Sequence, residues 1–420
     1  MMVQPRRRIC FVWNYLSWGG AQVWMLAVMK MAKRDWDIVV ILPKASSPEI
    51  VRYLDDLGVS YEFVDHFLDY APAPTLGRKV ARQLNRMKVE LNTFRNLLRF
   101  DVRDTVFHVE IAPWQSVAFL TAMSLRGAKV FLTLHNFLPD APRWRTALWK
   151  ARFRFVSRLR GINFFASNND TRNRLRGWVT DNFWNRIRVT FTAVNPPQID
   201  DALNAAFDRD STLAALGIPA TDFVVLCVGQ FIDRKGRWVF LDAAREIVQT
   251  RRDVSFVWLT PQLPNDEDEQ RISEYKLGEK FKLVLSETLG KDRTDVLRFF
   301  RIADVFTLPS FVEGLPIALL EAMALERPSI STNVYAIPEA IKDRETGILI
   351  EAGDSKALAE AIALLKDDAE LRRRLARNGR EFVIRNFDER DAAAKAIEAY
   401  KESIDGNRPI HEGKDERDRD

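Results

Sequence analysis

Short runs of β-branched and apolar residues alternate with helical patterns along nearly the whole chain, and this alternation limits the possible folds strongly. In the first half the candidate strands are 9–13, 38–42, 61–64, 105–109, 129–134, 162–166 and 187–191. In the second half they are 223–228, 254–259, 282–285, 304–308, 329–332 and 347–350. Strands that alternate with helices form parallel sheets with helices on both faces. The sequence therefore predicts an α/β protein with two doubly wound, Rossmann-like sheets.

The break between the two series lies at Asn195-Pro196-Pro197. A chain of 420 residues is also longer than one hydrophobic core usually supports. We expect an N-terminal domain over 1–195 and a C-terminal domain over 196–385. A terminal helix over 386–405 is expected to pack back on the N-terminal domain, and the charged residues 406–420 are expected to be disordered. Ligands of open α/β sheets bind at the carboxyl ends of the strands.

Composition and charge narrow the class of protein. The only cysteines, Cys10 and Cys227, each lie within an apolar run, so we interpret them as small buried residues in a protein of a reducing compartment. No apolar stretch reaches the ~20 residues that span a bilayer, and polar residues interrupt the segment after the first arginines, as they do not in a signal peptide. We expect a cytoplasmic protein. Its net charge of +5 combines a basic first half with an acidic second half, which suggests that the first half contacts an anionic surface.

The strongest motif is PSFVEGLPIALLEAMA at residues 309–324. A strand is expected to end just before it, a loop to carry Glu313 and Gly314, and a helix to begin near Pro316, where proline is tolerated. The first turn of such a helix directs free backbone N–H groups at an anion such as a diphosphate. Glu321 follows in the helix, ~12 Å from Glu313 along the axis. Its carboxylate could accept hydrogen bonds from the two vicinal hydroxyl groups of a ribose.

This run resembles the Glu-seven-residues-Glu motif of retaining glycosyltransferases with the two-domain GT-B fold, family 4 in particular. The resemblance covers about residues 8 to 400. It implies a nucleoside-diphosphate sugar donor on the C-terminal domain, an acceptor on the N-terminal domain, and no metal or other cofactor. It further implies that Glu313 positions the sugar and Glu321 anchors the ribose. Backbone amides near Gly314 and Leu315 would stabilise the departing diphosphate.

The loop after the first strand of the second series, GQFIDRKG at 229–236, resembles the loop of this family that holds the donor diphosphate. Lys235 matches the lysine of that loop, whereas Gln230 stands where the family has an arginine. Glutamine can donate a hydrogen bond to a phosphate, but it brings no charge. Arg234 could supply the missing charge or could simply face solvent.

In the N-terminal half, Gly19 and Gly20 resemble the glycine-rich loop that lets the backbone of these enzymes approach donor and acceptor. His135 follows a candidate strand and matches a histidine that contacts the transferred sugar in the family. Glu110 follows another strand, where relatives often carry a second histidine, and its role is open.

Further along the chain, Ile337-Pro338-Glu339 matches another element of the family, although Glu339 could simply cap the next helix. Tyr335-Ala336 stands before it, where many relatives have Gly-Gly. Together with Gln230, this departure leaves a second interpretation open, a catalytically degenerate relative that binds a sugar nucleotide. An epimerase of the same fold is a third.

Metal and nucleic-acid sites are not expected. The acid-x-acid pairs at 35–37 and 266–268 lie outside the predicted site, and the histidines and cysteines show no zinc spacing. Aromatic and basic residues interleave at 143–160, but no nucleic-acid recognition motif accompanies them. We instead expect this stretch to contact an anionic membrane, which would suit a lipid-linked acceptor or another glycan acceptor.

The stretch 143–160 holds no acidic residue. If it is helical, we expect a core-facing stripe of apolar residues (Leu148, Ala151, Phe155 and Leu159). Trp149 and Phe153 would then lie among the arginines on another face. The alternative is an ordinary amphipathic helix with a solvated basic face. A second basic run, 78–103, lies earlier in the chain.

Overall fold

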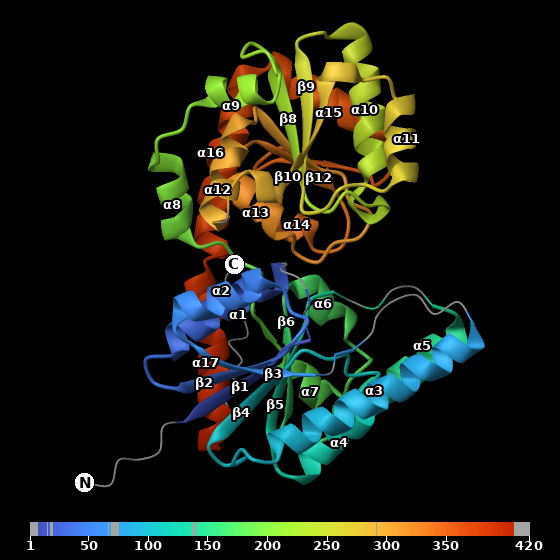
Figure 1. Ribbon diagram of the computed structural model, residues 1–420, viewed down its shortest axis with the longest axis vertical. Coiled ribbons are helices and arrows are strands. Elements are labelled where there is room, and N and C mark those ends of the chain that lie inside the picture. Colours follow the sequence, from blue (N-terminus) through green and yellow to red (C-terminus); the bar gives the residue numbers. More distant parts are fainter. Residues whose placement is uncertain are drawn as a thin grey trace, which may run out of the picture.

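The computed structural model has two lobes, each built around one parallel sheet (Figure 1). It describes residues 7–14, 16, 20–65, 67–68, 75–136, 138, 141–290 and 292–406. The sheet of the N-terminal lobe has the strand order β3-β2-β1-β4-β5-β6-β7. Its strands are β1 (Arg8–Val12), β2 (Asp37–Pro43), β3 (Ser60–Val64), β4 (Thr105–Val109), β5 (Lys129–Leu134), β6 (Ile162–Ala166) and β7 (Arg188–Val189). Its helices are α1 (Gly20–Ala32), α2 (Pro48–Leu57), α3 (Leu76–Leu97), α4 (Val117–Leu125), α5 (Arg143–Val156), α6 (Asn169–Arg174) and α7 (Asp181–Arg186).

The sheet of the C-terminal lobe has the order β10-β9-β8-β11-β12-β13. Its strands are β8 (Phe223–Val228), β9 (Val254–Thr260), β10 (Phe281–Leu285), β11 (Val305–Leu308), β12 (Ser329–Thr332) and β13 (Ile348–Ile350). Its helices are α8 (Pro196–Asn204), α9 (Arg209–Ala215), α10 (Arg237–Thr250), α11 (Asp266–Glu274), α12 (Arg293–Phe299), α13 (Ile317–Ala324), α14 (Ile337–Ala340), α15 (Ser355–Asp367) and α16 (Ala369–Asn386). Two parallel, doubly wound sheets confirm the predicted fold class.

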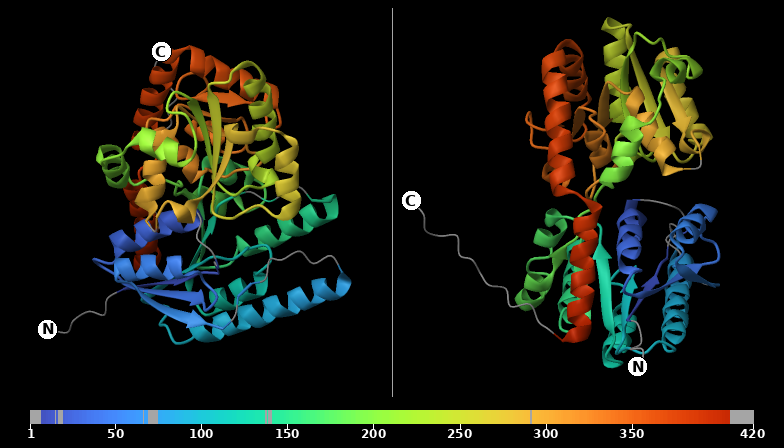
Figure 2. Two further views of the ribbon diagram at one scale, coloured as in Figure 1. Left: turned by 45° about the horizontal axis from the view of Figure 1, so that its top comes forward. Right: turned by 90° about the vertical axis from the view of Figure 1, so that its left-hand side faces the viewer.

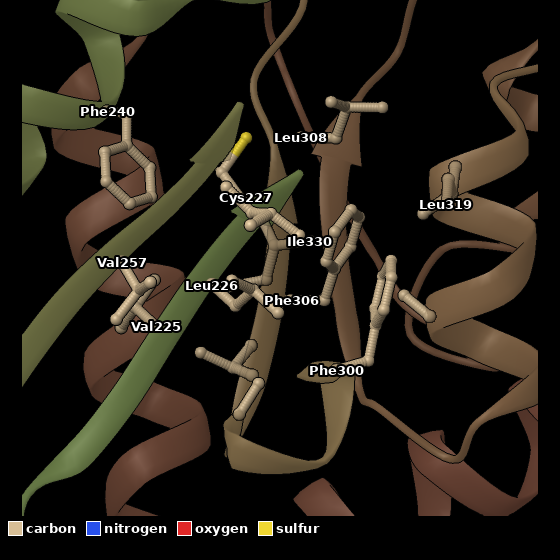
Figure 3. Packing of buried hydrophobic residues seen from close by; sticks show 14 of the residues in the cluster. Val225, Leu226, Cys227, Phe240, Val257, Phe300, Phe306, Leu308, Leu319 and Ile330 are labelled. Carbon is tan, nitrogen blue, oxygen red and sulfur yellow. The ribbon is translucent and has the colours of Figure 1, made fainter. Parts of the chain in front are cut away.

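Burial on both faces explains why the central strands are continuously apolar. Every residue of β9 is buried, and in β8 only the last is partly exposed. Parallel strands covered by helices on both faces need apolar side chains at successive positions, not at alternate ones. Figure 3 shows Cys227 of β8 among the core residues of this lobe. Both cysteines are buried and unpaired, as expected, and burial raises the pKa of Cys10 to about 12.

The chain crosses between the lobes twice, and the two crossings are bonded to each other. The N–H of Val194 donates to the carbonyl of Phe387 (2.9 Å), and the N–H of Glu389 donates to the carbonyl of Val194 (2.9 Å). After the second crossing, α17 (Glu389–Asp405) returns along the N-terminal lobe (Figure 2). There Tyr400 is buried in one apolar cluster with Trp24 and other residues of the lobe. Helix α17 is thus part of the N-terminal core.

Helix α5 has the opposite orientation to the one predicted. Phe153, expected among the arginines, is buried and stacks on Trp114 with a centroid distance of 5.5 Å. Leu148 and Phe155, expected in the core, are 42% and 46% exposed. Two apolar stripes compete on this helix, and the one that faces the core packs Phe153 against the rings of Trp114, Phe164 and Trp178.

Candidate active site

The motif loop 309–316 lies at the carboxyl end of β11 and leads into α13. Two side chains of the neighbouring strand β12 fix its start by hydrogen bonds. Ser331 Oγ donates to the carbonyl of Leu308 (2.7 Å), and Thr332 Oγ1 donates to that of Ser310 (2.6 Å). Pro316 precedes the first residue of α13, as expected for a proline at a helix start. The loop is therefore fixed to the sheet at the edge where a doubly wound fold binds its ligands.

Two other predicted site residues, Lys235 and Arg234, lie beside Glu313. Its side chain is buried, and its Oε1 atom lies 2.5 Å from Lys235 Nζ and 2.8 Å from Ser310 Oγ. Its Oε2 atom lies 3.7 Å from the guanidinium of Arg234. That guanidinium also donates to the carbonyl of Val312 (3.0 Å). Arg234 thus lies against the motif loop, although 42% of its side chain remains exposed.

Local backbone geometry places Lys235 there. A short 3-10 helix, Asp233–Lys235, ends at Gly236, which has a left-handed backbone with φ of 75°. A Cβ atom at Gly236 would overlap the carbonyl of Pro309, so this position must be glycine. Gln230 is exposed, at the start of the same loop after β8. The loop therefore offers two cations, Arg234 and Lys235, near the N-terminal end of α13.

Glu321 lies on α13 and is buried against Arg293, the first residue of α12. Burial raises the pKa of Glu321, and the charge and hydrogen bond of Arg293 oppose that rise. Leu315, in the motif loop just before α13, is buried. A ribose that takes Glu321 as its hydrogen-bond acceptor must therefore share it with Arg293 or displace the guanidinium, which the sequence did not indicate.

His135 and the motif loop meet between the lobes. His135 follows β5, and its carbonyl accepts from Ser167 Oγ (2.9 Å). A Cβ atom at Gly314 would lie 2.5 Å from that same carbonyl oxygen, so the backbone of the motif loop rests directly on the end of β5. The structure thus places the backbone of His135 next to the motif loop. Gly20 begins α1, and Gly19 lies outside the described residues.

Glu110 connects His135 to a buried network that the sequence did not reveal. Its carboxylate lies 3.4 Å from Nε2 of His135 and 3.2 Å from Nε2 of His108. Burial alone would raise the pKa of Glu110, but hydrogen bonds from His108 and His135, with their charges, hold it well below its usual range. His108 in turn contacts the hydroxyl of Tyr400. A partner 292 residues away leaves no local signal in the sequence.

Glu339 binds the opposite lobe instead of capping its own helix. Its carboxylate accepts the backbone N–H groups of Asn169 (3.0 Å) and Asp170 (2.8 Å), at the start of α6. Tyr335 has a left-handed backbone with φ of 49°, and the guanidinium of Arg174 lies 4.9 Å from its ring centroid. Glu339 and Tyr335 therefore form a bridge between the lobes.

The acid-x-acid pairs take part in ordinary ion pairs: Asp37 lies near Arg8, and Asp268 contacts Arg237 at 2.5 Å. Within the described ranges, no three or more His, Cys, Asp or Glu side chains form a group that could hold a metal ion. None of the helices in the part of the chain that the structure describes is long and apolar enough to span a bilayer.

Comparisons with known proteins show similarity to glycosyltransferases. Residues 208–382 match the family model described as glycosyl transferases group 1. The chain is 28% identical over 217 residues to a D-inositol 3-phosphate glycosyltransferase of Paenarthrobacter aurescens, covering 51% of this chain and 52% of that protein. It is 32% identical over 167 residues to the capsular polysaccharide biosynthesis glycosyltransferase CapM of Staphylococcus aureus, covering 40% of this chain and 42% of that one. The chain thus spans about half the length of the curated relatives it matches.

Solved structures match over nearly the whole chain. A glycosyltransferase from Rickettsia africae superposes with a TM-score of 0.74 at 19% identity, covering 96% of this chain and all of that one. HepE of Anabaena, solved with UDP-glucose, has a TM-score of 0.72 at 15% identity, covering 94% of this chain and 99% of that one. At these identities the likeness concerns the fold, which is GT-B.

Proposed function

We propose that this chain, whose residues 208–382 belong to the glycosyl transferases group 1, is a retaining glycosyltransferase that uses a nucleoside-diphosphate sugar. The observation that supports this most directly is the cluster around Glu313. There a buried carboxylate and two cations, Arg234 and Lys235, adjoin the N-terminal end of α13 at the carboxyl edge of the sheet. Such a site offers positive charge to a departing diphosphate and an acceptor to the hydroxyl groups of a sugar.

The roles follow from position. Lys235 and Arg234, with the amides near Gly314 and Leu315, would stabilise the diphosphate as it leaves, because each puts positive charge where negative charge develops. Glu313 would hold the sugar, and Glu321 the ribose. His135 and the glycine-rich loop at Gly19 and Gly20 would form the facing wall, and Gln230 would add an uncharged donor. We propose that the reaction needs no metal, since Lys235 and Arg234 supply the positive charge that a metal ion would otherwise provide.

Metal independence gives a direct prediction. Activity should survive EDTA, because Lys235 and the amides at the start of α13 carry the leaving-group charge. Rates are compared before and after chelation and after addition of Mg²⁺ or Mn²⁺. A complete loss that either ion restores would show that a metal carries that charge.

The proposed acceptor is a glycan or a lipid-linked sugar at an anionic membrane, reached through residues 143–160 of the N-terminal lobe. Helix α5 presents a stripe of exposed apolar side chains, Trp144, Leu148 and Phe155, at helical spacing. Exposed arginines lie on the same helix, at 143, 145, 152 and 154, and Arg158 follows just after its end. Apolar side chains beside cations suit the headgroup layer, where insertion and charge attraction add.

Helix α3 repeats this pattern. Its exposed large apolar residues fall on one face at spacings of three and four: Leu76, Val80, Leu84, Met87 and Leu91. Leu98, also exposed, follows directly after the helix. Basic residues, including Lys88 and Arg95, are exposed on the same helix. Helix α4 contacts both α3 and α5. In Figures 1 and 2, α3 and α5 extend from the same side of the lobe. Both helices could therefore meet one surface.

Co-sedimentation with vesicles tests this contact. Binding should favour phosphatidylglycerol over phosphatidylcholine, weaken with salt, and fall when Arg152, Arg154 and Arg158 are changed to Glu. Leu84→Gln with Leu91→Gln should also lower binding, whereas Leu125→Gln should not, since Leu125 is 85% exposed on α4 outside both stripes. Equal recovery in the supernatant with both lipids at low salt would favour a soluble acceptor.

The activity is tested by the release of nucleoside diphosphate from UDP-, GDP- and ADP-sugars, with and without a pool of candidate acceptors. Transfer requires acceptor-dependent release together with a labelled product. Binding without release would favour the degenerate relative that Gln230 and Tyr335 leave open. Conversion of the sugar without release of free diphosphate would favour an epimerase.

A further inference from the structure

Glu110, directly after β4, is a buried carboxylate between two histidine rings. Only 6% of its side chain is exposed. Each oxygen faces a different ring: Oε1 lies 3.2 Å from Nε2 of His108, and Oε2 lies 3.4 Å from Nε2 of His135. The roles proposed above do not use this residue.

The chemistry of a carboxylate decides where the hydrogens of the two rings are. Hydrogen bonds from both histidines outweigh burial and keep the pKa of Glu110 low, so the group is ionised at neutral pH. An ionised carboxylate only accepts hydrogen bonds. An Nε2 lone pair that faced this charge would be repelled by it, so we expect each facing Nε2 atom to carry a hydrogen.

His108 is fixed on its other side as well. Its Nδ1 atom lies 2.5 Å from the hydroxyl of Tyr400, which can donate to it, and its Nε2 atom also lies 3.0 Å from Thr133 Oγ1. The ring is fully buried and stacks on Phe11 with a centroid distance of 5.5 Å. A Tyr400 hydroxyl that donates to Nδ1 leaves the hydrogen of His108 on Nε2, where it faces Glu110 and Thr133, and the packed ring cannot turn away.

His135 differs from His108 because part of its ring reaches solvent. Its side chain is 26% exposed, although its Nε2 atom is buried against Glu110. With the hydrogen on Nε2, the Nδ1 atom on the other side of the ring carries a lone pair. The backbone of His135 is held by Ser167 and lies beneath Gly314 of the motif loop. The Nδ1 atom of His135 is therefore a fixed hydrogen-bond acceptor beside the motif loop.

We propose that Glu110 is a positioning residue that fixes His135 in the Nε2–H tautomer, so that its Nδ1 atom accepts a hydrogen bond from a hydroxyl group of the bound sugar. Only the identity of that ligand rests on the proposed function. Glutamine cannot replace Glu110, because its single carbonyl oxygen cannot serve both rings. Its NH₂ group would face the other Nε2 atom and favour a lone pair there. Because Tyr400 holds His108, His135 is the ring expected to change.

Nitrogen-15 NMR of histidine-labelled, full-length protein tests this, because two-bond correlations distinguish the tautomers and the chain has only four histidines. His108→Gln and His135→Gln assign the signals. We expect His135 to carry its hydrogen on Nε2 in the wild type and on Nδ1 in Glu110→Gln. A wild-type ring with its hydrogen on Nδ1, or an unchanged tautomer in Glu110→Gln, would overturn the proposal. If Glu110→Gln does not fold, the wild-type spectrum decides alone.

Tyr400→Phe is the matched control. It removes the contact to His108 and leaves the pair of Glu110 and His135 intact, so the signals of His108 should change while His135 keeps its tautomer. In kinetics with the correct donor, Glu110→Gln should lower kcat at least tenfold, with a smaller change in KM. The NMR result does not depend on turnover. An inactive wild type with the expected tautomers would therefore count against the proposed function alone.

Discussion

At the scale of single residues, the site depends on charges held away from water. Lys235 and Glu313 are 13% and 6% exposed, so each stabilises the other in a region where an unpaired charge is costly. A diphosphate that forms an ion pair with Lys235 in place of Glu313 leaves that carboxylate free. Glu313 can then accept a hydrogen bond from a hydroxyl group of the sugar. Binding of the donor and positioning of the sugar would thus be coupled through one ion pair.

This coupling predicts different defects for the two glutamates. Glu321→Ala should weaken donor binding, because the ribose loses its acceptor. Glu313→Ala should chiefly lower turnover, because the sugar loses its position in the transition state. Losing a hydrogen bond to a charged group costs about 1.5–3 kcal/mol, or roughly 10- to 150-fold. Steady-state kinetics with the correct donor measure both. Wild-type kinetics in both variants would show that this motif is not the active site.

Gly314 predicts a steric effect. A methyl group there would meet the carbonyl of His135 and the side chain of Asn136, both on the N-terminal lobe. Gly314→Ala should therefore force the lobes apart at this point and lower kcat/KM without unfolding either core. Kinetics and circular dichroism together check this. Gly77→Ala is the control, because nothing lies within 4 Å of a Cβ there. Equal kinetics for the two variants would show that Gly314 is not in close contact with His135 and Asn136.

At the scale of elements, the sequence indicated the strands more reliably than the orientation of helices. The run FVVLCV predicts β8 because a strand buried on both faces needs apolar residues throughout. Helix α5 carries two apolar stripes, and its own residues do not say which one meets Trp114. Family motifs single out Lys235 and Glu313 separately. Their ion pair, like the contact of Glu110 with His135, could not be predicted, because each joins segments that only the fold brings together.

A matched pair of substitutions tests the orientation of α5. Phe153→Ala should destabilise the protein by about 3–5 kcal/mol, because it removes a buried ring from contact with Trp114. Phe155→Ala, two residues on, should change stability by roughly 0.5 kcal/mol or less, because its ring is exposed. Denaturant unfolding of both variants measures the difference. A larger loss for Phe155→Ala would restore the orientation that the sequence pattern suggested.

At the scale of the whole molecule, the lobes are joined by two chain crossings and by a bridge of side chains. Glu339 reaches the start of α6, and Tyr335 lies against Arg174. Tyr335 keeps a left-handed backbone that favours glycine, at a cost of roughly 1–3 kcal/mol. The contact with Arg174 offsets part of that cost only while the lobes are together.

The bridge predicts that Glu339→Ala widens the average separation of the lobes. Small-angle X-ray scattering should give a larger radius of gyration for this variant, because the first N–H groups of α6 lose their acceptor. Glu351→Ala is the control, since Glu351 is exposed on the same lobe. The same radius for Glu339→Ala and the wild type would show that the bridge does not hold the lobes.

We expect the cluster at Glu313 and Glu321 to bind the nucleoside diphosphate of a sugar donor. Thermal unfolding of the wild type with UDP, GDP and ADP, each in EDTA, tests it most directly. A ligand at 100 times its Kd stabilises the folded state by about 2.7 kcal/mol. We predict that one diphosphate raises the Tm of the wild type and has much less effect on Lys235→Ala and Glu321→Ala. No shift with any of the three, or equal shifts in the wild type and both variants, would contradict the claim.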